Sequence, residues 1–379
     1  MGNLLGKAGA LCLGGNNTPF IRMLLRGAAA GGAAAGNRVT VHTFPSPVQG
    51  GWALRKNQAD RGLFLESRDQ NYLRIWVLDQ WGLPANEDHL LYLENRIQTE
   101  SLFKVGDSQI GLLASTPLTA TQWADEVVNE ASLSHPMFRH LTVAVEGPSP
   151  SNAALTQALQ TLGCRVEKHW RPGIPSFSSL WGGFSLQARD EQGALISPNQ
   201  LLTLQVLLEM EHGKGNVTLP VDTTAAATLV AMGYNGQIEY LTGKDKDPAW
   251  PHYAAQPWLW SAPSAAVRIC ARMRTSGQSL VALLRKIPRF DRHSRDIPFA
   301  GGQTQAAVLL AGKSFTSLPG GGSRIRTESG WVSLFPRSAA LRITAEGPDL
   351  ELAAELCSQY AHRALHLKQI MEGCANDKK

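Results

Sequence analysis

The feature of this sequence that most constrains its fold is a pattern that occurs three times along the chain. Each copy has a short apolar run, a polar residue, an alanine-rich stretch, a glycine and a second apolar run, and the copies span residues 10–41, 141–166 and 217–240. Short β-branched runs are typical of buried strands, a polar residue caps the helix that alanine favours, and glycine permits the left-handed conformation that ends it. Because a strand–helix–strand crossover joins parallel strands, each copy predicts a parallel α/β unit.

Three glycines, Gly36, Gly163 and Gly233, are expected to end the helices of the three copies. The copies are separated by segments with patterns of their own, such as a hairpin over residues 184–196 followed by a helix that begins at Pro198. These separations favour three α/β domains. One large doubly wound sheet is the alternative interpretation of the same pattern.

The C-terminal part of the chain has a different pattern. Strands are predicted over residues 323–326, 331–335 and 341–345, the first two joined by a turn around Gly330. A helix is predicted over residues 349–367, with one apolar face made of Leu350, Ala353, Leu356, Cys357 and Tyr360. This order predicts a small α+β domain.

Composition limits the classes of function. Hydrophobic residues make up 43% and charged residues 18% of the 379 residues, which indicates a folded globular protein. The net charge of +5 favours anionic ligands but is too small to indicate nucleic-acid binding. The five cysteines are scattered without metal-binding spacing, so we expect reduced thiols and no zinc site. No run reaches the roughly 20 apolar residues of a membrane span, so we expect no membrane partner, and the scattered cysteines favour a cytoplasmic protein.

Three α/β units followed by an α+β domain is an order that resembles the phosphohexomutases, the family of phosphoglucomutases and phosphomannomutases. The resemblance covers nearly the whole chain and rests on the order of short segments, at residues 62–69, 75–82, 94–97, 190–202, 276–280, 287–290 and 330–343. The chain is most similar to the mutase-like domain that is joined to sugar-nucleotide pyrophosphorylases, a domain that is often degenerate.

The resemblance implies a fold and a division into domains. The implied fold is α/β, with three phosphohexomutase-like α/β/α domains that contain mainly parallel mixed sheets, plus a C-terminal α+β domain. The implied domains are residues 1–132 with the nucleophile loop, 133–212 with the metal loop, 213–297 with the sugar loop and 298–379 with the phosphate loop.

The nucleophile loop of the family reads Thr-Ala-Ser-His-Asn-Pro, and the resemblance places Ser67 at its serine. Ser67 is therefore the candidate catalytic residue that would carry a phosphate. Arg68 stands at the family's histidine and is a candidate phosphate ligand, because guanidinium groups bind phosphate oxygens. The charge of Glu66 would repel a phosphate at close range, so the alternative is a solvated loop serine.

The metal loop departs furthest from the family's Asp-Gly-Asp-Ala-Asp-Arg. Residues 177–184 read Phe-Ser-Ser-Leu-Trp-Gly-Gly-Phe, and no Asp or Glu occurs from Lys168 to Arg189. Magnesium binds carboxylate oxygens, so we expect no metal ligands and no cofactor. Because phosphoryl transfer depends on a cation that offsets developing charge, mutase turnover is not expected.

The remaining two loops are also altered. The family's sugar loop uses a glutamate, but no acidic residue occurs from Pro248 to Phe290. Aromatic side chains stand there instead and would either stack on a sugar or fill a core: Trp250, His252, Tyr253, Trp258 and Trp260. The family's phosphate loop, Arg-Pro-Ser-Gly-Thr-Glu-Pro, is shortened to residues 335–340, where Arg337 and Ser338 are either phosphate ligands or an exposed turn.

Altered loops on a retained scaffold indicate a degenerate, non-catalytic phosphohexomutase-family protein of carbohydrate metabolism. Its expected ligand is a sugar phosphate, or a partner enzyme such as a sugar-nucleotide pyrophosphorylase. An active phosphoglucomutase or phosphomannomutase with divergent loops is the alternative, so whether the chain is an enzyme stays open. A second alternative, an anion-binding interaction protein, follows from residues 244–295, which contain ten Lys or Arg and three Asp.

Overall fold

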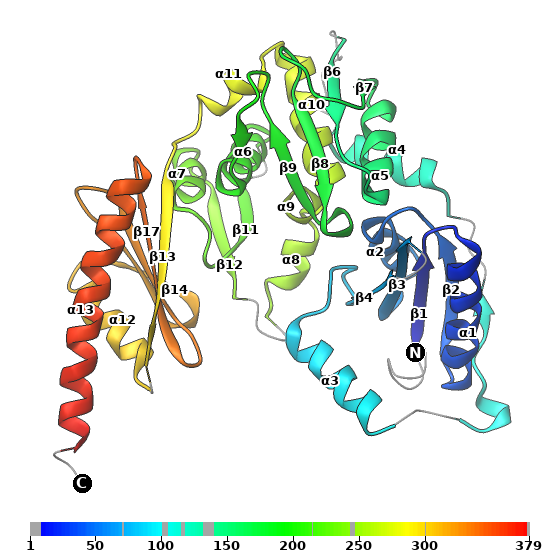
Figure 1. Ribbon diagram of the computed structural model, residues 1–379, viewed down its shortest axis with the longest axis horizontal. Helices are drawn as coiled ribbons and strands as arrows, with labels where there is room; N and C mark the ends of the chain where they lie inside the picture. The colour runs from blue at the N-terminus through cyan, green and yellow to red at the C-terminus, as the bar shows by residue number, and fades with distance from the viewer. Residues whose placement is uncertain are drawn as a thin grey trace. The chain divides into compact units, whose positions relative to one another are not determined.

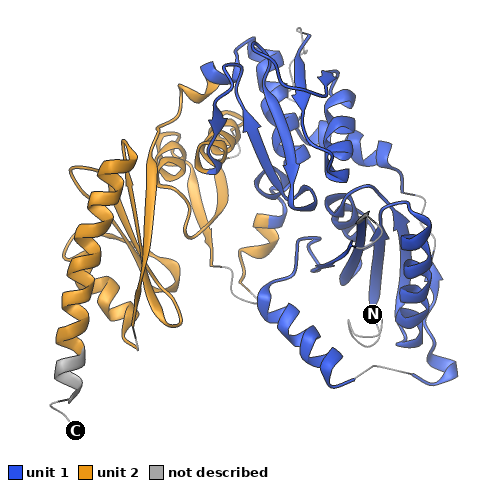
Figure 2. Cartoon of the chain, in the orientation of Figure 1, with its two compact units in different colours: residues 1–198, 254–282 blue, residues 199–253, 283–379 orange. Residues whose placement is uncertain are grey.

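The computed structural model describes residues 9–69, 72–100, 105–114, 118–131, 140–213, 215–242, 247–299 and 301–376, and only the backbone of residues 68, 69 and 372–376. The chain divides into two compact units (Figure 2). Unit 1 contains Met1–Pro198 and Ala254–Ala282, and unit 2 contains Asn199–Tyr253 and Leu283–Lys379. No helix within the described ranges is long and apolar enough to cross a membrane.

The first sheet of unit 1 has five strands in the order β4-β3-β1-β2-β5 (Figure 1). The strands are β1 (Ala10–Gly15), β2 (Arg38–Thr43), β3 (Arg61–Asp69), β4 (Tyr72–Leu78) and β5 (Leu113–Ala114). All neighbours are parallel except β4, which returns antiparallel to β3 along one edge. The first copy of the sequence pattern therefore forms the centre of a mixed sheet.

Helices cover both faces of this sheet, because alternate strand residues point to opposite sides. The helices of this part of the chain are α1 (Pro19–Ala34), α2 (Pro47–Lys56), α3 (Glu87–Gln98) and the short 3-10 helix η2 (Asp107–Gln109), whereas α4 (Ala120–Ala131) packs mainly on α5 (Pro150–Thr161) and α10 (Ala262–Ser276) of the second sheet. On one face, Ile21 of α1 packs in an apolar cluster with Leu13 and Leu65. On the other, Gly50 of α2 and Gly14 of β1 leave room for the ring of Phe64.

The second sheet of unit 1 has the order β10-β9-β8-β6-β7. Strand β6 is parallel to β7 and β8, and β8, β9 and β10 form an antiparallel meander. Helix α10 packs on β8 and β9 and also contacts α4 and α5. The elements are β6 (Thr142–Val145), α5 (Pro150–Thr161), β7 (Arg165–Glu167), β8 (Ser176–Leu180), η3 (Trp181–Gly183), β9 (Ser185–Arg189), β10 (Leu195–Ile196), α9 (Pro257–Trp260) and α10 (Ala262–Ser276).

Unit 2 contains the third copy of the pattern as a two-stranded parallel sheet, β11 (Asn216–Pro220) and β12 (Gln237–Leu241), joined by α7 (Ala225–Gly233). The flanking helices are α6 (Pro198–Glu211) and α8 (Trp250–Ala254), and α6 begins at Pro198 as predicted. Helix α11 (Leu280–Leu284) crosses from unit 1 into unit 2.

The helix-ending glycines are confirmed in two copies and wrong in the third. Gly36 and Gly163 have φ of 85° and 88°. Gly233 lies inside α7, and the left-handed residue is Asn235, with φ of 55°. Asparagine is among the few side chains that tolerate this region, so it can replace glycine there.

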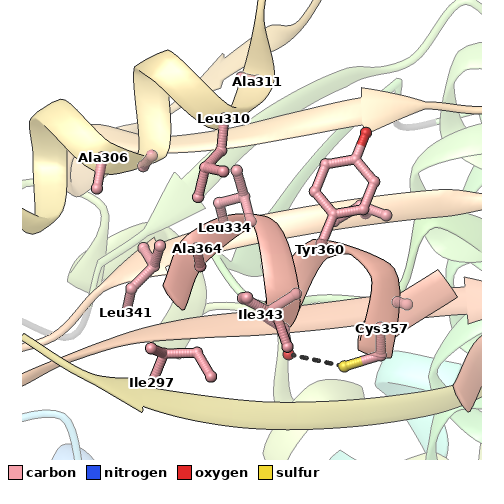
Figure 3. Packing of buried hydrophobic residues seen from close by; sticks show 14 of the residues in the cluster. Ile297, Ala306, Leu310, Ala311, Leu334, Leu341, Ile343, Cys357, Tyr360 and Ala364 are labelled. Carbon is pink, nitrogen blue, oxygen red and sulfur yellow. Dashed lines mark hydrogen bonds between the residues drawn. The ribbon is translucent and has the colours of Figure 1, made fainter. Parts of the chain in front are cut away.

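The last sheet of unit 2 is fully antiparallel, in the order β13-β17-β16-β15-β14. The elements are β13 (Asp291–Pro298), α12 (Gln303–Ala311), β14 (Thr316–Leu318), η4 (Pro319–Gly321), β15 (Gly322–Arg326), β16 (Trp331–Pro336), β17 (Ala340–Gly347) and α13 (Leu350–Asn376). Helices α12 and α13 share one apolar cluster with this sheet, in which Leu310, Leu334 and Tyr360 pack together (Figure 3). The predicted face of α13 is confirmed except for Leu350, which starts the helix and is exposed.

Unit 2 also buries two charged side chains, between the last sheet and α7. Arg324 of β15 donates three hydrogen bonds, to Ser333 Oγ at 3.0 Å, Thr228 Oγ1 at 3.0 Å and the Thr223 carbonyl oxygen at 2.6 Å. Glu346 of β17 accepts a hydrogen bond of 2.6 Å from the amide of Ala225, in the first turn of α7. We call Arg324, Glu346 and these partners the α7 joint.

The expected fold class is confirmed, since each copy of the pattern lies in its own parallel or mixed sheet and an α+β region follows. The domain boundaries after residues 132, 212 and 297 stay a prediction.

Candidate functional site

The segment at the position of the family's metal loop, where no metal ligands are expected, follows β8 in unit 1, beyond the carboxyl ends of the parallel strands β6 and β8. Its three central residues have positive φ: Trp181 at 51°, Gly182 at 65° and Gly183 at 101°. The amide of Phe184 donates to the carbonyl of Trp181 at 3.2 Å, which closes a left-handed turn. We call residues 181–184 the β8 turn. A tryptophan rarely adopts this conformation, so Trp181, which is 73% exposed, is held in it at an energetic cost.

Contacts with α2 and β4 hold the β8 turn in place. The hydroxyl of Ser46, the residue before α2, donates to the Gly182 carbonyl at 2.9 Å. A Cβ atom at Gly182 would lie 2.7 Å from Pro47 Cγ and 2.8 Å from the ring of Trp76. Glycine is therefore required at this position for its conformation and for the close approach of these neighbours.

Hydroxyl and amide groups lie where the resemblance places carboxylates. Asn152 Oδ1 accepts a hydrogen bond of 2.7 Å from the Ser179 amide, and Ser151 Oγ donates to the Ser179 carbonyl at 3.1 Å. The buried Ser179 hydroxyl and the buried side-chain amide of Gln49 have no hydrogen-bond partner among the described residues. Within those same ranges, no three His, Cys, Asp or Glu side chains are grouped to hold a metal. The groups around the β8 turn do not fit a magnesium ion, which requires anionic oxygens.

Ser67 lies in strand β3 and not in a loop, and its role as the catalytic residue stays a prediction. It pairs in register with Leu73 of β4, and the antiparallel ladder continues to Asp69 after a bulge. The Asn16 side chain holds its backbone, donating to the Ser67 carbonyl at 2.7 Å and accepting from its amide at 3.2 Å. Arg68 lies in the same strand, and its side chain is outside the described residues.

The register of β3 separates Ser67 from the β8 turn. Ser67 alternates in phase with Leu65, which packs on the α1 face of the sheet. Glu66 alternates with Phe64 on the α2 face, where Trp76 Nε1 donates to it at 3.2 Å. Because Trp76 also contacts the β8 turn, Glu66 shares a face with that turn and Ser67 does not.

The aromatic ring of Phe184, the last residue of the β8 turn, packs between two tryptophan rings. The ring of Phe184 lies 5.9 Å from Trp76 and 6.4 Å from Trp260, and the Arg55 guanidinium lies 4.8 Å from the centre of the Trp260 ring. Trp258 is also buried, beneath Arg268 at 4.9 Å. Of the aromatic residues predicted for the sugar loop, Trp258 and Trp260 thus contribute to a core.

The other three aromatic residues of that prediction lie in unit 2. Trp250 and Tyr253 pack edge to face at 5.9 Å, and His252 Nδ1 lies 2.8 Å from Glu239 Oε2. Of these three side chains, the exposed imidazole of His252 is the most accessible to a ligand. A sugar-binding role for these residues stays a prediction.

Arg337 and Ser338 lie in the exposed turn between β16 and β17. The amide of Arg337 donates to the Ala340 carbonyl at 2.8 Å, and the Ser338 carbonyl accepts from Gln303 Nε2 at 3.2 Å. Hydrogen bonds from Arg342 lower the pKa of Asp296, and the positive charge of Arg337 adds to this effect. The structure thus brings Arg337 and Ser338 together on an accessible turn, with a positive charge available.

A half-buried carboxyl group of unit 1 serves a different turn. Asp79 Oδ1, just after β4, accepts from the amides of Trp81 at 2.9 Å and Leu83 at 3.0 Å. Burial raises the pKa of Asp79 to about 6, and these hydrogen bonds and the charge of Arg55 oppose the rise. Asp79 therefore stabilises its own loop.

Sequence reasoning missed the buried polar residues Ser46, Gln49 and Asn152. A Ser-Pro pair before an apolar run is typical of a helix start and could have indicated that Ser46 precedes α2. Nothing in the sequence indicated that its hydroxyl would bond a turn 136 residues away.

Comparison with known proteins finds likeness in structure alone. No protein-family model matches the sequence, and no curated protein matches it. A phosphoglucomutase/phosphomannomutase family protein from Burkholderia thailandensis has a TM-score of 0.70 at 14% identity, covering 97% of this chain and 92% of that one. A candidate phosphomannomutase from Thermus thermophilus has a TM-score of 0.62 at 14% identity, covering 96% and 92%.

A more distant likeness extends to a eukaryotic protein. The exocytosis-sensitive phosphoprotein parafusin of Paramecium, a phosphoglucomutase in its open form, has a TM-score of 0.58 at 11% identity, covering 96% of this chain and 89% of that one. Likeness over nearly the full length of all three chains shows that this protein has the phosphohexomutase fold.

Proposed function

We propose that this chain is a phosphohexomutase-family protein of carbohydrate metabolism that binds a phosphorylated sugar without transferring its phosphoryl group. The β8 turn carries the proposal. The turn is made of Trp181, Gly182 and Gly183, and it packs against Pro47 and Trp76. Turnover would require carboxylates around a cation at this place.

The chemistry of phosphoryl transfer supports this proposal. Negative charge on the transferred oxygens must be offset, and a bound divalent cation is the usual means. The groups that hydrogen-bond with the β8 turn and the end of β8 are neutral: the Asn152 and Ser151 side chains, which bond the Ser179 backbone, and the Ser46 hydroxyl, which donates to the Gly182 carbonyl. Neutral oxygens without a carboxylate bind magnesium weakly, so they supply little stabilisation of the transition state.

The position of Ser67 supports the same conclusion. Its side chain alternates with Leu65 toward α1, while the β8 turn contacts Trp76 on the opposite face. A phosphate on Ser67 would therefore project away from the turn.

For the ligand, we assign the phosphate group to Arg337 and Ser338. Their turn is exposed, and a guanidinium next to a hydroxyl matches the oxygens of a phosphate monoester. The same turn would suit contact with a partner enzyme, and the resemblance implies a sugar-nucleotide pyrophosphorylase.

An activity assay tests the catalytic half of the proposal. The purified chain is incubated with glucose 1-phosphate, a glucose 1,6-bisphosphate activator and magnesium, and glucose 6-phosphate is followed by a coupled assay. We expect no turnover above background and no added phosphate by intact mass. The alternative, an active mutase, is favoured by the two hydrogen bonds with which Asn16 fixes the Ser67 backbone. Turnover that Ser67→Ala abolishes and Ser185→Ala retains would establish it.

A binding assay tests the other half. Melting temperature is measured with glucose 1-phosphate, glucose and inorganic phosphate, since a ligand that binds the folded state raises it. We expect the sugar phosphate to raise the melting temperature. In Arg337→Ala, the same rise should require an at least tenfold higher concentration of glucose 1-phosphate. Arg326→Ala, at an exposed arginine of the same sheet, is the matched control. Equal responses of the two variants would reject the assigned phosphate site.

A further inference from the structure

Unit 1 has an open cavity at the end of its second sheet that is opposite to the β8 turn. We call it the α10 cavity. It has a volume of about 410 Å³, and its border includes Leu141 and Thr142 at the start of β6 and Ile174 and Pro175 just before β8. The β8 turn lies at the other end of β8, whose five residues span roughly 16 Å. The α10 cavity is therefore separate from the β8 turn.

Basic residues border the α10 cavity from three segments. Arg171 lies in the loop between β7 and β8, Arg274 in the last turn of α10, and His140 before the start of β6. The Arg274 guanidinium donates to the Leu162 carbonyl, but a guanidinium has five N–H groups and serves several acceptors at once. Two guanidinium groups at one cavity suit the oxygens of a phosphate or a carboxylate.

One acidic residue, Glu191, belongs to the described border of the cavity. Both of its carboxylate oxygens are already engaged, because Oε1 accepts from the Leu280 amide at 2.6 Å and Oε2 from the Val281 amide at 3.1 Å. Hydrogen bonds from these amides offset the charge of the carboxylate. Glu191 therefore opposes an anion less than an unbonded carboxylate would.

Arg171 has a partner with which a bound anion would compete. Its guanidinium donates to Glu167 Oε2 at 3.0 Å and to Oε1 at 3.2 Å. The Arg171 side chain is 60% exposed, and ion pairs at such positions are weak because water and salt screen them. An anion in the α10 cavity can replace Glu167 at this guanidinium, so removal of the Glu167 charge should strengthen binding.

Two further observations indicate a ligand larger than a single ion. The volume of the α10 cavity falls in the range of roughly 300–1,000 Å³ that is usual for small-molecule sites. Gln278 borders the cavity, and its buried Oε1 has no hydrogen-bond partner within the described ranges. A hydroxyl group of the ligand would supply the missing donor once this amide turns toward it.

We propose that the α10 cavity binds a small organic anion, a phosphate monoester or a carboxylate with hydroxyl groups, through Arg171 and Arg274. This site does not depend on the proposed function, whose phosphate ligands Arg337 and Ser338 belong to unit 2.

The experiment measures the melting temperature of the full chain with glycerol 3-phosphate, glycerate and glycerol, which share hydroxyl groups and differ in charge. A ligand that binds the folded state raises this temperature. We expect at least one of the two anions to raise it and glycerol at the same concentration to leave it unchanged. The anion that acts at the lower concentration identifies the chemical group that the site prefers.

Substitutions then locate the bound anion. Arg171→Gln should require about tenfold more of that anion for the same rise, because a charge-assisted hydrogen bond is lost. Glu167→Gln should require less. Arg165→Gln is the matched control and should respond as the natural chain does: Arg165 is also exposed and lies 3.9 Å from Glu167, but it is outside the described border of the cavity.

Three results would overturn the proposal: no rise with either anion, an equal rise with glycerol, or equal responses of Arg171→Gln and Arg165→Gln. Arg337→Ala separates this site from the phosphate site of the proposed function and should leave the response unchanged. A response that Arg337→Ala removes and Arg171→Gln retains would assign the anion to unit 2 and reject the α10 cavity.

Discussion

The α7 joint in unit 2 and the β8 turn in unit 1 both bury polar side chains, but they treat charge differently. The joint retains a buried arginine and a buried glutamate: Arg324 donates to Thr228 and to the Thr223 carbonyl, and Glu346 accepts from the Ala225 amide at the start of α7. The β8 turn and the end of β8 are held by the side chains of Ser46, Ser151 and Asn152, and the buried Ser179 hydroxyl has no partner in the described part of the chain.

This difference shows which buried groups the chain can keep without a ligand. An unpaired charge in the interior costs far more than an unpaired hydroxyl or amide. Arg324 is tolerated because three protein groups accept its hydrogen bonds. Carboxylates at the β8 turn would require a cation for the same purpose, so their absence is consistent with a turn that carries none. Three of the four predictions below test this contrast, and the one at Asp79 tests what a desolvated carboxyl group costs elsewhere in unit 1.

The largest effect is expected when the α7 joint is broken. Arg324→Met removes the guanidinium and leaves the Thr223 carbonyl and two hydroxyls without a donor. We expect a loss of about 3–5 kcal/mol in the free energy of unfolding, measured by urea titration. Arg326→Met, at an exposed arginine 5.7 Å from the Trp331 ring, should cost below about 1 kcal/mol. Equal losses would mean that the joint does not stabilise unit 2.

A second prediction tests how tightly the β8 turn is packed. Gly182→Ala adds a Cβ atom within 2.8 Å of both Pro47 and Trp76 in a left-handed residue, so we expect a loss of about 2–4 kcal/mol. Gly173 also has positive φ, 92°, but no atom within 4 Å of its added Cβ. Gly173→Ala should therefore cost only the backbone term of about 1–2 kcal/mol. Similar urea midpoints for the two variants would contradict the close packing.

A third prediction concerns the half-buried carboxyl group of Asp79. Its pKa of about 6 in the folded protein exceeds the ordinary value of 3.8, so the folded state holds the proton more tightly. The resulting stabilisation is complete below pH 3.8 and is lost as pH rises through 6. Asp79→Asn keeps an acceptor for the Trp81 and Leu83 amides, and we expect it to be more stable than the natural chain by about 2 kcal/mol at pH 7.

The measurement for Asp79 is the difference in unfolding free energy between the two proteins at several pH values. This difference should be small near pH 4 and increase toward pH 7. A difference that does not vary with pH would show that Asp79 titrates normally.

The smallest effect is expected at Trp181. Trp181→Asn replaces an exposed side chain in the left-handed region with one that tolerates that region, so we expect a gain of about 0.5–1 kcal/mol. Leu180→Asn, at a partly exposed neighbour with extended backbone at φ of −106°, is the control and should give no gain. Loss of stability in the Trp181 variant would mean that its indole makes contacts that outweigh the strain.

The elements of the fold could be predicted from the sequence because their signals are local. Apolar runs, a helix-capping residue and a terminating glycine lie within a few residues of one another, and β1, α1 and β2 formed as that pattern predicts. Errors arose where two residue types can do the same task, as when Asn235 ended α7 in place of Gly233. Leu350 fits the periodicity of α13, but at the first position of the helix it lies beyond the sheet and is exposed.

The candidate site could be predicted only in part, because it depends on contacts between distant segments. Residues 62–69 lack a signal that distinguishes a loop from a strand, and pairing with β4 decides between them. That pairing also sets the face on which Ser67 lies. The bond from Ser46 to the β8 turn joins segments 136 residues apart and has no counterpart in local sequence.

Because unit 1 consists of two separate stretches of chain, it cannot finish folding until the second stretch has been translated. Helix α10, which packs on β8 and β9, is synthesised only after the whole of Asn199–Tyr253 has been made. At about 5–20 residues per second, the face of the second sheet that α10 covers stays open for several seconds during translation. The nascent chain therefore exposes this uncovered apolar surface while later segments emerge. A chaperone would bind the surface during this interval.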